Sequence, residues 1–315
     1  DQALICFQDS ADHLEKITGE GEVQAKSLLS SVYNRMSRVC LALNDLDQAI
    51  KFKEFAISAQ KRLVELEPET QRYKFVLANQ MDNLGSLYLE SKNDPAALEI
   101  LSEAADILRN SGSQEDDAKI LLIRILSRIG RTETNNNDYD SARADLTDAV
   151  SLCREGYQQN PEQYGYELAN VLDDLGNLEG SANNLDQALI YFQDSADHLQ
   201  EITGEGEAQA KSLLSNVYNR MSRVGRALND LDQAIKYKEF AISAQKRLIE
   251  LEPETQRFKL VLASLMDARA SLVSNNLNVM MKNLNAIVIS VAVPSFFAAV
   301  GGMSEFSMVV SPEHW

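Results

Sequence analysis

One 26-residue stretch of the chain occurs twice, and this repetition constrains the fold more than any other feature. Residues 43–68 read LNDLDQAIKFKEFAISAQKRLVELEP, and residues 228–253 repeat them with two substitutions. Apolar residues recur at helical spacing along one side, at Leu46, Ala49, Ile50, Ile57 and Val64. Asn44-Asp45 favours a helix start and Glu67-Pro68 a helix end. The stretch is therefore expected to be an amphipathic helix that needs neighbours to bury its apolar side.

The pattern recurs with a period near 46 residues. A polar Asn/Asp pair precedes an expected helix start six times, at Leu46, Pro95, Tyr139, Leu185, Leu231 and Leu277. Each unit is expected to contain helix A, a short turn and helix B. The expected pairs are 23–43 with 46–66, 71–91 with 95–110, 117–135 with 139–158, 163–181 with 185–203, and 208–228 with 231–251. Residues 1–22 are expected to be a truncated repeat that keeps only helix B, so the chain resembles a fragment without its true N-terminus.

A second repetition spans whole units. Residues 1–82 match residues 186–267 with thirteen differences, at an offset of 185 residues. This offset is four units, so the displacement preserves every type of helix–helix interface, which a helical array tolerates.

Small residues recur at fixed places in each unit. A small residue in helix A, such as Gly85 or Gly130, is followed by alanine twelve residues later, usually by another small residue after seven more, and in several units by proline. This pattern resembles the tetratricopeptide repeat family. The resemblance implies an all-α, right-handed α-solenoid over residues 23–263, with five helix pairs and a concave groove that binds a protein segment. The period departs from the usual ~34 residues, which implies longer helices, and Tyr88 is the one good match to the family's aromatic position in helix A.

The repeat pattern stops near Ser264. Residues 264–282 are expected to form a stalk-like helix, and residues 283–304 contain no charge over 22 positions. That length can span a hydrocarbon core of ~30 Å, so a transmembrane helix is expected there. Residues 305–315 form a tail. Lys282 and Arg269 precede the span, which favours a single-pass orientation with the repeats in the cytoplasm.

This end of the chain resembles the first transmembrane segment of the CorA-type magnesium transporter family. The similar residues are SNNLNVMMKNL from Ser274 to Leu284, Pro294 in mid-span and Gly302-Met303. The resemblance implies that Asn278, Met281 and Leu284 face a pore, and that the tail assembles a homo-oligomer. Gly302, Met303 and Ser304 stand where that family carries Gly-Met-Asn. Ser304 in place of asparagine, and one span without a second, favour an anchor over a selective channel.

Composition excludes several functions. The net charge of −17 argues against nucleic acid as a partner, because phosphate backbones require a basic face. The three cysteines, Cys6, Cys40 and Cys153, indicate no disulfide framework. No nucleotide-binding, zinc-binding or nucleophile motif is present. We therefore expect no enzyme activity, catalytic residue, cofactor or metal site.

Three arginine pairs flank the small residue of helix A in alternate units. They are Arg35 and Arg38, Arg128 and Arg131, and Arg220 and Arg223. Guanidinium pairs of this kind are suited to an acidic peptide or a C-terminal carboxylate in the groove. The alternative is that Asp82, Asp173 or Asp174 nearby neutralises each pair.

Three interpretations follow. The first is a protein-interaction scaffold that binds a peptide or protein segment, anchored to a membrane at its C-terminus. The second is a fragment of a CorA-like divalent cation transporter with a helical-repeat domain. The third is a chimeric or incomplete gene product without a native function.

Overall fold

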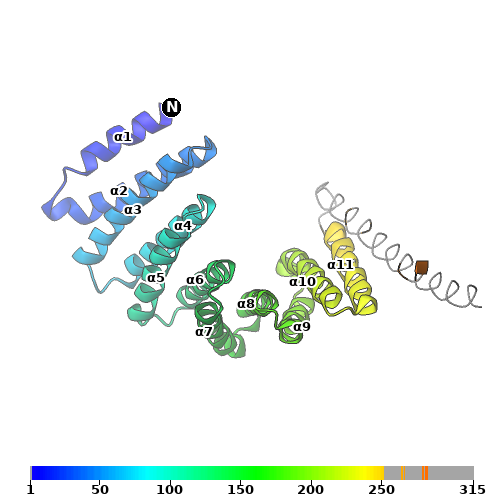
Figure 1. Ribbon diagram of the computed structural model, residues 1–315. Helices are drawn as coiled ribbons and strands as arrows, with labels where there is room; N and C mark the ends of the chain where they lie inside the picture. Colours follow the sequence, from blue (N-terminus) through cyan, green and yellow to red (C-terminus); the bar gives the residue numbers. More distant parts are fainter. Residues whose placement is uncertain (1, 252–263, 265, 267–278, 280, 283–315) are drawn as a thin grey trace, which may run out of the picture. The chain divides into compact units, whose positions relative to one another are not determined.

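The computed structural model describes residues 2–251 together with residues 264, 266, 279, 281 and 282. The chain divides into two compact units, Asp1–Arg220 and Met221–Trp315. Within the described part every regular element is helical, so the expected all-helical repeat array is confirmed there (Figure 1). The α-helices are α1 (Gln2–Leu14), α2 (Glu22–Ala42), α3 (Leu46–Leu66), α4 (Gln71–Glu90), α5 (Asp94–Ser111), α6 (Asp116–Asn135), α7 (Tyr139–Gln159), α8 (Pro161–Ser181), α9 (Leu185–Glu201), α10 (Glu207–Ala227) and α11 (Leu231–Leu251).

The expected helix pairs agree with the observed helices to within two residues at each end. Helix α1 ends at Leu14, inside the truncated repeat expected over residues 1–22. Short 3₁₀ turns, Gly19–Gly21 and Gly204–Gly206, precede α2 and α10. The expected membrane helix at 283–304, the tail and most of the stalk lie outside the described residues. Within that stalk, Ser264, Met266, Val279, Met281 and Lys282 are helical.

The turn between helix A and helix B has the same backbone structure in all five pairs, and a side chain caps helix B in all of them except α9, where Asn184 makes no such bond. After α2, Asn44 adopts a left-handed backbone with φ 60°, and the amide of Asp45 donates to the carbonyl of Cys40 at 2.9 Å. The carboxylate of Asp45 then accepts from the amide of Gln48 at 3.1 Å, which caps α3. Asparagine tolerates the left-handed region better than most residues. The polar pairs of the sequence therefore terminate one helix and start the next.

The small residues lie where the helices cross. The alanine that lies twelve positions after the small residue of helix A is fully buried in all five pairs. These alanines are Ala49, Ala97, Ala142, Ala188 and Ala234. In unit 1 a core of Leu, Ile and Ala side chains runs from α3 through α8 without interruption. Each helix from α1 to α9 contacts its sequence neighbours, and the A helices α4, α6 and α8 also contact one another in order. Helices α4, α6 and α8 therefore share one face, and Arg128 and Arg131 lie on it.

Two kinds of helix pair differ at one crossing. In three pairs helix A has glycine, and a Cβ added there would lie 2.5–2.6 Å from Leu101, Leu146 or Phe192, sixteen residues later. In the pairs α2–α3 and α10–α11 the small residue is Ser37 or Ser222, and the residue sixteen positions later is Lys53 or Lys238. Both serine hydroxyls donate to a carbonyl of helix B at 2.8 Å. A large apolar side chain in helix B thus requires glycine sixteen positions earlier in helix A. Where helix A has serine at that place, helix B has lysine.

Candidate functional site: an arginine groove between α2 and α4

The arginines of α6 and α10 bind carboxylates of neighbouring A helices. Arg128 Nε lies 3.1 Å from Asp82 Oδ1 on α4, and its Nη1 donates to the hydroxyl of Ser86. Arg131 Nε lies 3.9 Å from Asp174 Oδ2 on α8. These pairs correspond to the structural alternative stated for the arginines in the sequence analysis.

The same arrangement recurs at the end of unit 1. Arg220 donates to Asp173 on α8. Arg223, in unit 2, lies close enough to Lys238 to contribute to the lowering of its pKa, which burial causes in the first place.

The paired carboxylates are deeply buried. Asp173 and Asp174 are 2 % and 4 % exposed, and Glu167 beside them accepts two bonds from Arg124, at 2.9 and 2.5 Å. Burial raises the pKa of Asp174 to about 7, although Arg131 and the Ser127 hydroxyl oppose the shift. Because a buried carboxylate needs a cationic or hydrogen-bonding partner, these arginines are required by the fold itself.

Arg35 and Arg38 on α2 make no ion pair with any residue that the structure describes. For Arg38 the sequence explains the difference. Arg131 binds Asp174, two positions before the small residue of the next helix A, whereas the corresponding residue after Arg38 is the uncharged Asn83. Both guanidinium groups are exposed.

These two arginines lie in a groove of about 370 Å³ between α2 and α4, floored in part by α3, which we call the arginine groove. A third arginine, Arg72 in the first turn of α4, lines it from the opposite side and also makes no ion pair within the described residues. No carboxylate lines the groove. The remaining lining residues are Ser27, Ser30, Ser31, Asn34, Gln60, Tyr73, Val76 and Gln80.

The sequence analysis missed Arg72, although the repeats contain the signal. Thirteen residues before the small residue of helix A, the other four complete units have Gln24, Asp117, Gln163 and Gln209. Arginine at this position in α4 is therefore specific to one unit and to its copy at Arg257. Comparing whole units, rather than only the positions around the small residue, identifies it.

Lys53 adds a further positive charge beside the groove. Its ammonium group donates to Asn34 Oδ1 at 2.6 Å, and Asn34 lines the groove. Burial lowers the pKa of Lys53, and the charge of Arg38 lowers it further. The guanidinium of Arg38 and the ammonium of Lys53 therefore repel each other, and no carboxylate that lines the groove screens the two charges.

Gln80, which lines the arginine groove, has one buried side-chain atom without a hydrogen-bond partner. Gln80, 7 % exposed, donates through Nε2 to the hydroxyl of Ser30 at 2.9 Å, and its Oε1 accepts no hydrogen bond. Gln60 is satisfied, since its Nε2 donates to the carbonyl of Tyr73 at 3.1 Å. An unpaired buried acceptor is costly, and this one is enclosed by the protein.

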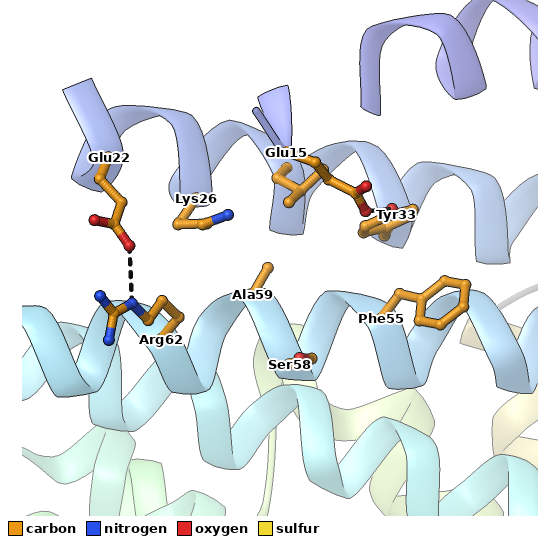
Figure 2. A pocket seen from close by; sticks show the side chains of 9 residues that line it. Glu15, Glu22, Lys26, Tyr33, Phe55, Ser58, Ala59 and Arg62 are labelled. Carbon is orange, nitrogen blue, oxygen red and sulfur yellow. Dashed lines mark hydrogen bonds and ion pairs between the residues drawn. The ribbon is translucent and has the colours of Figure 1, made fainter. Parts of the chain in front are cut away.

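Two other cavities carry different charges. One, of about 510 Å³ between the end of α1, α2 and α3, contains Arg62, but Arg62 Nε binds Glu22 Oε1 at 2.8 Å (Figure 2). Tyr33 also donates there to Glu15 at 2.5 Å. The other, of about 610 Å³ at the ends of α7 and α9, is lined by Glu162, Glu201 and Glu205. Carboxylates line both of these cavities, in contrast to the arginine groove.

The described residues contain no group of three or more His, Cys, Asp or Glu side chains arranged to hold a metal ion. No helix among them has both the length and the apolar character that crossing a membrane requires. Met281 is helical and 55 % exposed, and the other residues with an expected pore role, Asn278, Leu284, Gly302, Met303 and Ser304, lie outside the described part.

Comparison with known proteins agrees with this architecture. Residues 122–161, which cover most of α6 and all of α7, match the tetratricopeptide repeat family model. The described helices form a tetratricopeptide-like solenoid. No curated protein sequence matches the chain.

Two solved structures share the fold at low sequence identity. The crystal structure of BtubC (BKLC) from P. vanneervenii has 15 % identity and a TM-score of 0.58, covering 81 % of this chain and 92 % of that one. The S. pombe nuclear import adaptor Nro1 has 12 % identity and a TM-score of 0.50, covering 78 % of this chain and 86 % of that one. The tetratricopeptide-like array extends well beyond the 40 residues that match the family model.

Proposed function

We propose that this tetratricopeptide-like solenoid is a protein-interaction scaffold that binds an acidic segment of a partner protein in the arginine groove. The observation that carries the proposal is the charge of this groove. Arg35, Arg38 and Arg72 surround it without an ion pair among the described residues, whereas most of the related arginines are neutralised by buried carboxylates. A locally positive groove on a chain of net charge −17 attracts anionic segments selectively.

The proposal assigns different roles to the arginines. Arg128, Arg131 and Arg220 stabilise buried carboxylates and serve the scaffold. The ligand-binding role moves to Arg35, Arg38 and Arg72. Guanidinium groups donate two parallel hydrogen bonds to a carboxylate, which suits glutamate and aspartate side chains of a bound segment.

The test measures binding of a fluorescein-labelled hexaglutamate peptide to the full chain by fluorescence anisotropy. Arg38→Gln with Arg72→Gln is expected to weaken binding at least tenfold, because each charge-assisted contact contributes roughly 1.5–3 kcal/mol. Binding by the wild type is expected to weaken as salt rises. The matched control, Arg62→Gln with Arg109→Gln, changes the net charge equally but removes exposed paired arginines outside the groove. Equal binding by both double variants would contradict the proposal.

Membrane anchoring through residues 283–304 rests on the uncharged sequence and is proposed as a separate property of the chain. The test separates membranes from cytosol in cells that express the full chain or residues 1–262 with the same reporter. Only the full chain is expected in the membrane fraction. A full chain that remains in the cytosolic fraction would remove the anchor and, with it, the CorA-like interpretation of the tail.

A further inference from the structure

The two helices that wall the arginine groove run in the same direction. Helix α3 reverses the direction of α2, because Ser37 donates to the carbonyl of Ala49 while Lys53, further along α3, donates to Asn34, further back on α2. Helix α4 contacts α3 and reverses direction again across the short connection between them (Figure 1). Positions on α2 and α4 can therefore be compared directly along the groove.

The three arginines lie at opposite ends of this groove. Gln80 Nε2 donates to Ser30 Oγ at 2.9 Å, which places these two residues at the same level. Arg72 lies eight residues before Gln80, whereas Arg35 and Arg38 lie five and eight residues after Ser30. At about 1.5 Å per residue, Arg72 is about 20–24 Å from the other two along the groove. Side chains of both helices lean toward the same end, because a helical side chain leans toward the N-terminus of its helix, so the guanidinium groups keep this separation.

The two ends differ in charge and are separated by neutral surface. Arg35 and Arg38 stand one helical turn apart on α2, and the ammonium group of Lys53 lies beside them at Asn34. Among the described residues that line the other end, only Arg72 is a cation. The remaining lining residues are uncharged. An anionic ligand therefore meets positive charge at both ends of the groove and none between them.

The volume of the groove suits an extended ligand. A helix is about 10–12 Å across with its side chains, so a helical ligand about 20 Å long would fill roughly 1,600 Å³, several times the volume of about 370 Å³ between α2 and α4. An extended chain rises about 3.3 Å per residue, so about six to seven residues cover the distance between the two ends.

We propose that the arginine groove binds an extended segment with two acidic groups six to seven residues apart, one at Arg35 and Arg38 and the other at Arg72, with uncharged residues between them. This inference rests on the proposed scaffold function and specifies how the acidic residues of the ligand are spaced. A segment whose acidic residues are all adjacent to one another over three or four positions reaches only one end of the groove.

The test compares fluorescein-labelled peptides in which two Glu-Glu pairs are separated by one, three, five or nine alternating threonine and serine residues. The four peptides carry the same charge, and their binding to the full chain is measured by fluorescence anisotropy. The five-residue spacer places the centres of the two pairs about 23 Å apart in an extended chain. This peptide is expected to bind about tenfold more tightly than the peptide with the one-residue spacer, the ratio that one additional charge-assisted contact provides. The nine-residue spacer is expected to bind more weakly than the five-residue spacer, because its excess length must bulge out.

Single variants assign the two ends. Arg72→Gln is expected to abolish the preference for the five-residue spacer, so that this peptide binds no more tightly than the peptide with the one-residue spacer. Arg38→Gln is expected to weaken both peptides, because both engage the end that carries two arginines. Arg109→Gln is the control: it removes an exposed arginine that binds Asp148 outside the groove, and it should leave every affinity unchanged.

A further variant moves the cation instead of removing it. Val76 lines the groove one helical turn after Arg72, about 6 Å nearer to the level of Arg35. Arg72→Gln with Val76→Arg keeps the net charge and is expected to shift the preference from the five-residue to the three-residue spacer. A preference that stays at five residues would overturn the assignment of Arg72 to the second acidic group.

The outcomes separate this inference from the scaffold proposal. Equal affinity of the wild type for the four peptides, or tightest binding with the nine-residue spacer, would overturn the inferred spacing. Loss of binding in Arg38→Gln with Arg72→Gln would in that case leave the scaffold proposal in place. No binding by any of the four peptides would overturn both.

Discussion

At the residue scale, Gly130 allows α6 to pack directly on Leu146 of α7, since an added Cβ would lie 2.5 Å from Leu146 Cγ. Gly130→Ala is therefore expected to lower the free energy of unfolding by ~1–3 kcal/mol, as overpacked cores do. Leu146→Ala alone should cost ~2–5 kcal/mol. The double variant should cost less than the sum, because the alanine then has room. Urea denaturation of the wild type, the two single variants and the double variant gives the coupling free energy between Gly130 and Leu146. Losses of stability that simply add in the double variant would contradict the close contact.

Asp174 gives the second prediction at this scale. Burial raises its pKa to about 7, so the folded protein binds this proton more tightly than the unfolded chain does. The contribution of Asp174 to stability is therefore greatest at low pH, falls as the pH rises from about 4 to 7, and is constant above that range. Asp174→Asn keeps a polar group beside Ser127 but cannot ionise.

The difference in urea midpoint between Asp174→Asn and the wild type is expected to grow in favour of the variant from pH 5 to pH 8. Asp194→Asn, at an exposed aspartate, is the control and should show a constant difference. A difference for Asp174→Asn that stays equally constant would mean that Asp174 is ionised throughout this range.

At the scale of single elements, the A–B turns share one left-handed residue. It is asparagine at positions 44, 137, 183 and 229, but lysine at Lys92, with φ 61°. Lysine lacks the short polar side chain that makes this region accessible to asparagine. Lys92→Asn is therefore expected to stabilise the protein by about 0.5–1 kcal/mol, and Asn137→Lys to destabilise it similarly. Thermal unfolding of both variants provides the measurement, and shifts of the same sign would contradict this account.

These turns also show why most of the fold is predictable from the sequence. Asn44-Asp45 and its counterparts act through local hydrogen bonds, and the alanines at the crossings act within one helix pair, so their spacing alone indicates the architecture. The partners of the arginines depend instead on the neighbouring units. The sequence analysis could state the ion pairs of Arg128 and Arg220 only as an alternative, and it missed Arg72 because helix α4 carries it at the far end from the small residue.

At the scale of the whole molecule, each helix of unit 1 contacts few others, all close in sequence. Such arrays unfold in parts, from their least buried helices. Helices α6 and α8 bury residues on several sides, including Glu167 and Asp174 of α8, whereas among the side chains of α1 that the structure describes only Ala11 is fully buried. Hydrogen exchange followed by mass spectrometry should be slowest in α6 and α8 and fastest in α1. Uniform protection across α1 to α8 would indicate a single cooperative unit instead.

The coupling between the small residue of helix A and the side chain sixteen positions later has an evolutionary consequence. Serine occurs with lysine at Ser37 and Lys53, and glycine with leucine at Gly85 and Leu101. Recombination within a unit would join a serine-bearing helix A to a leucine-bearing helix B and create a clash. Recombination between units leaves each pair intact. The displacement of the copied segment by four complete units keeps each serine with its lysine sixteen residues later.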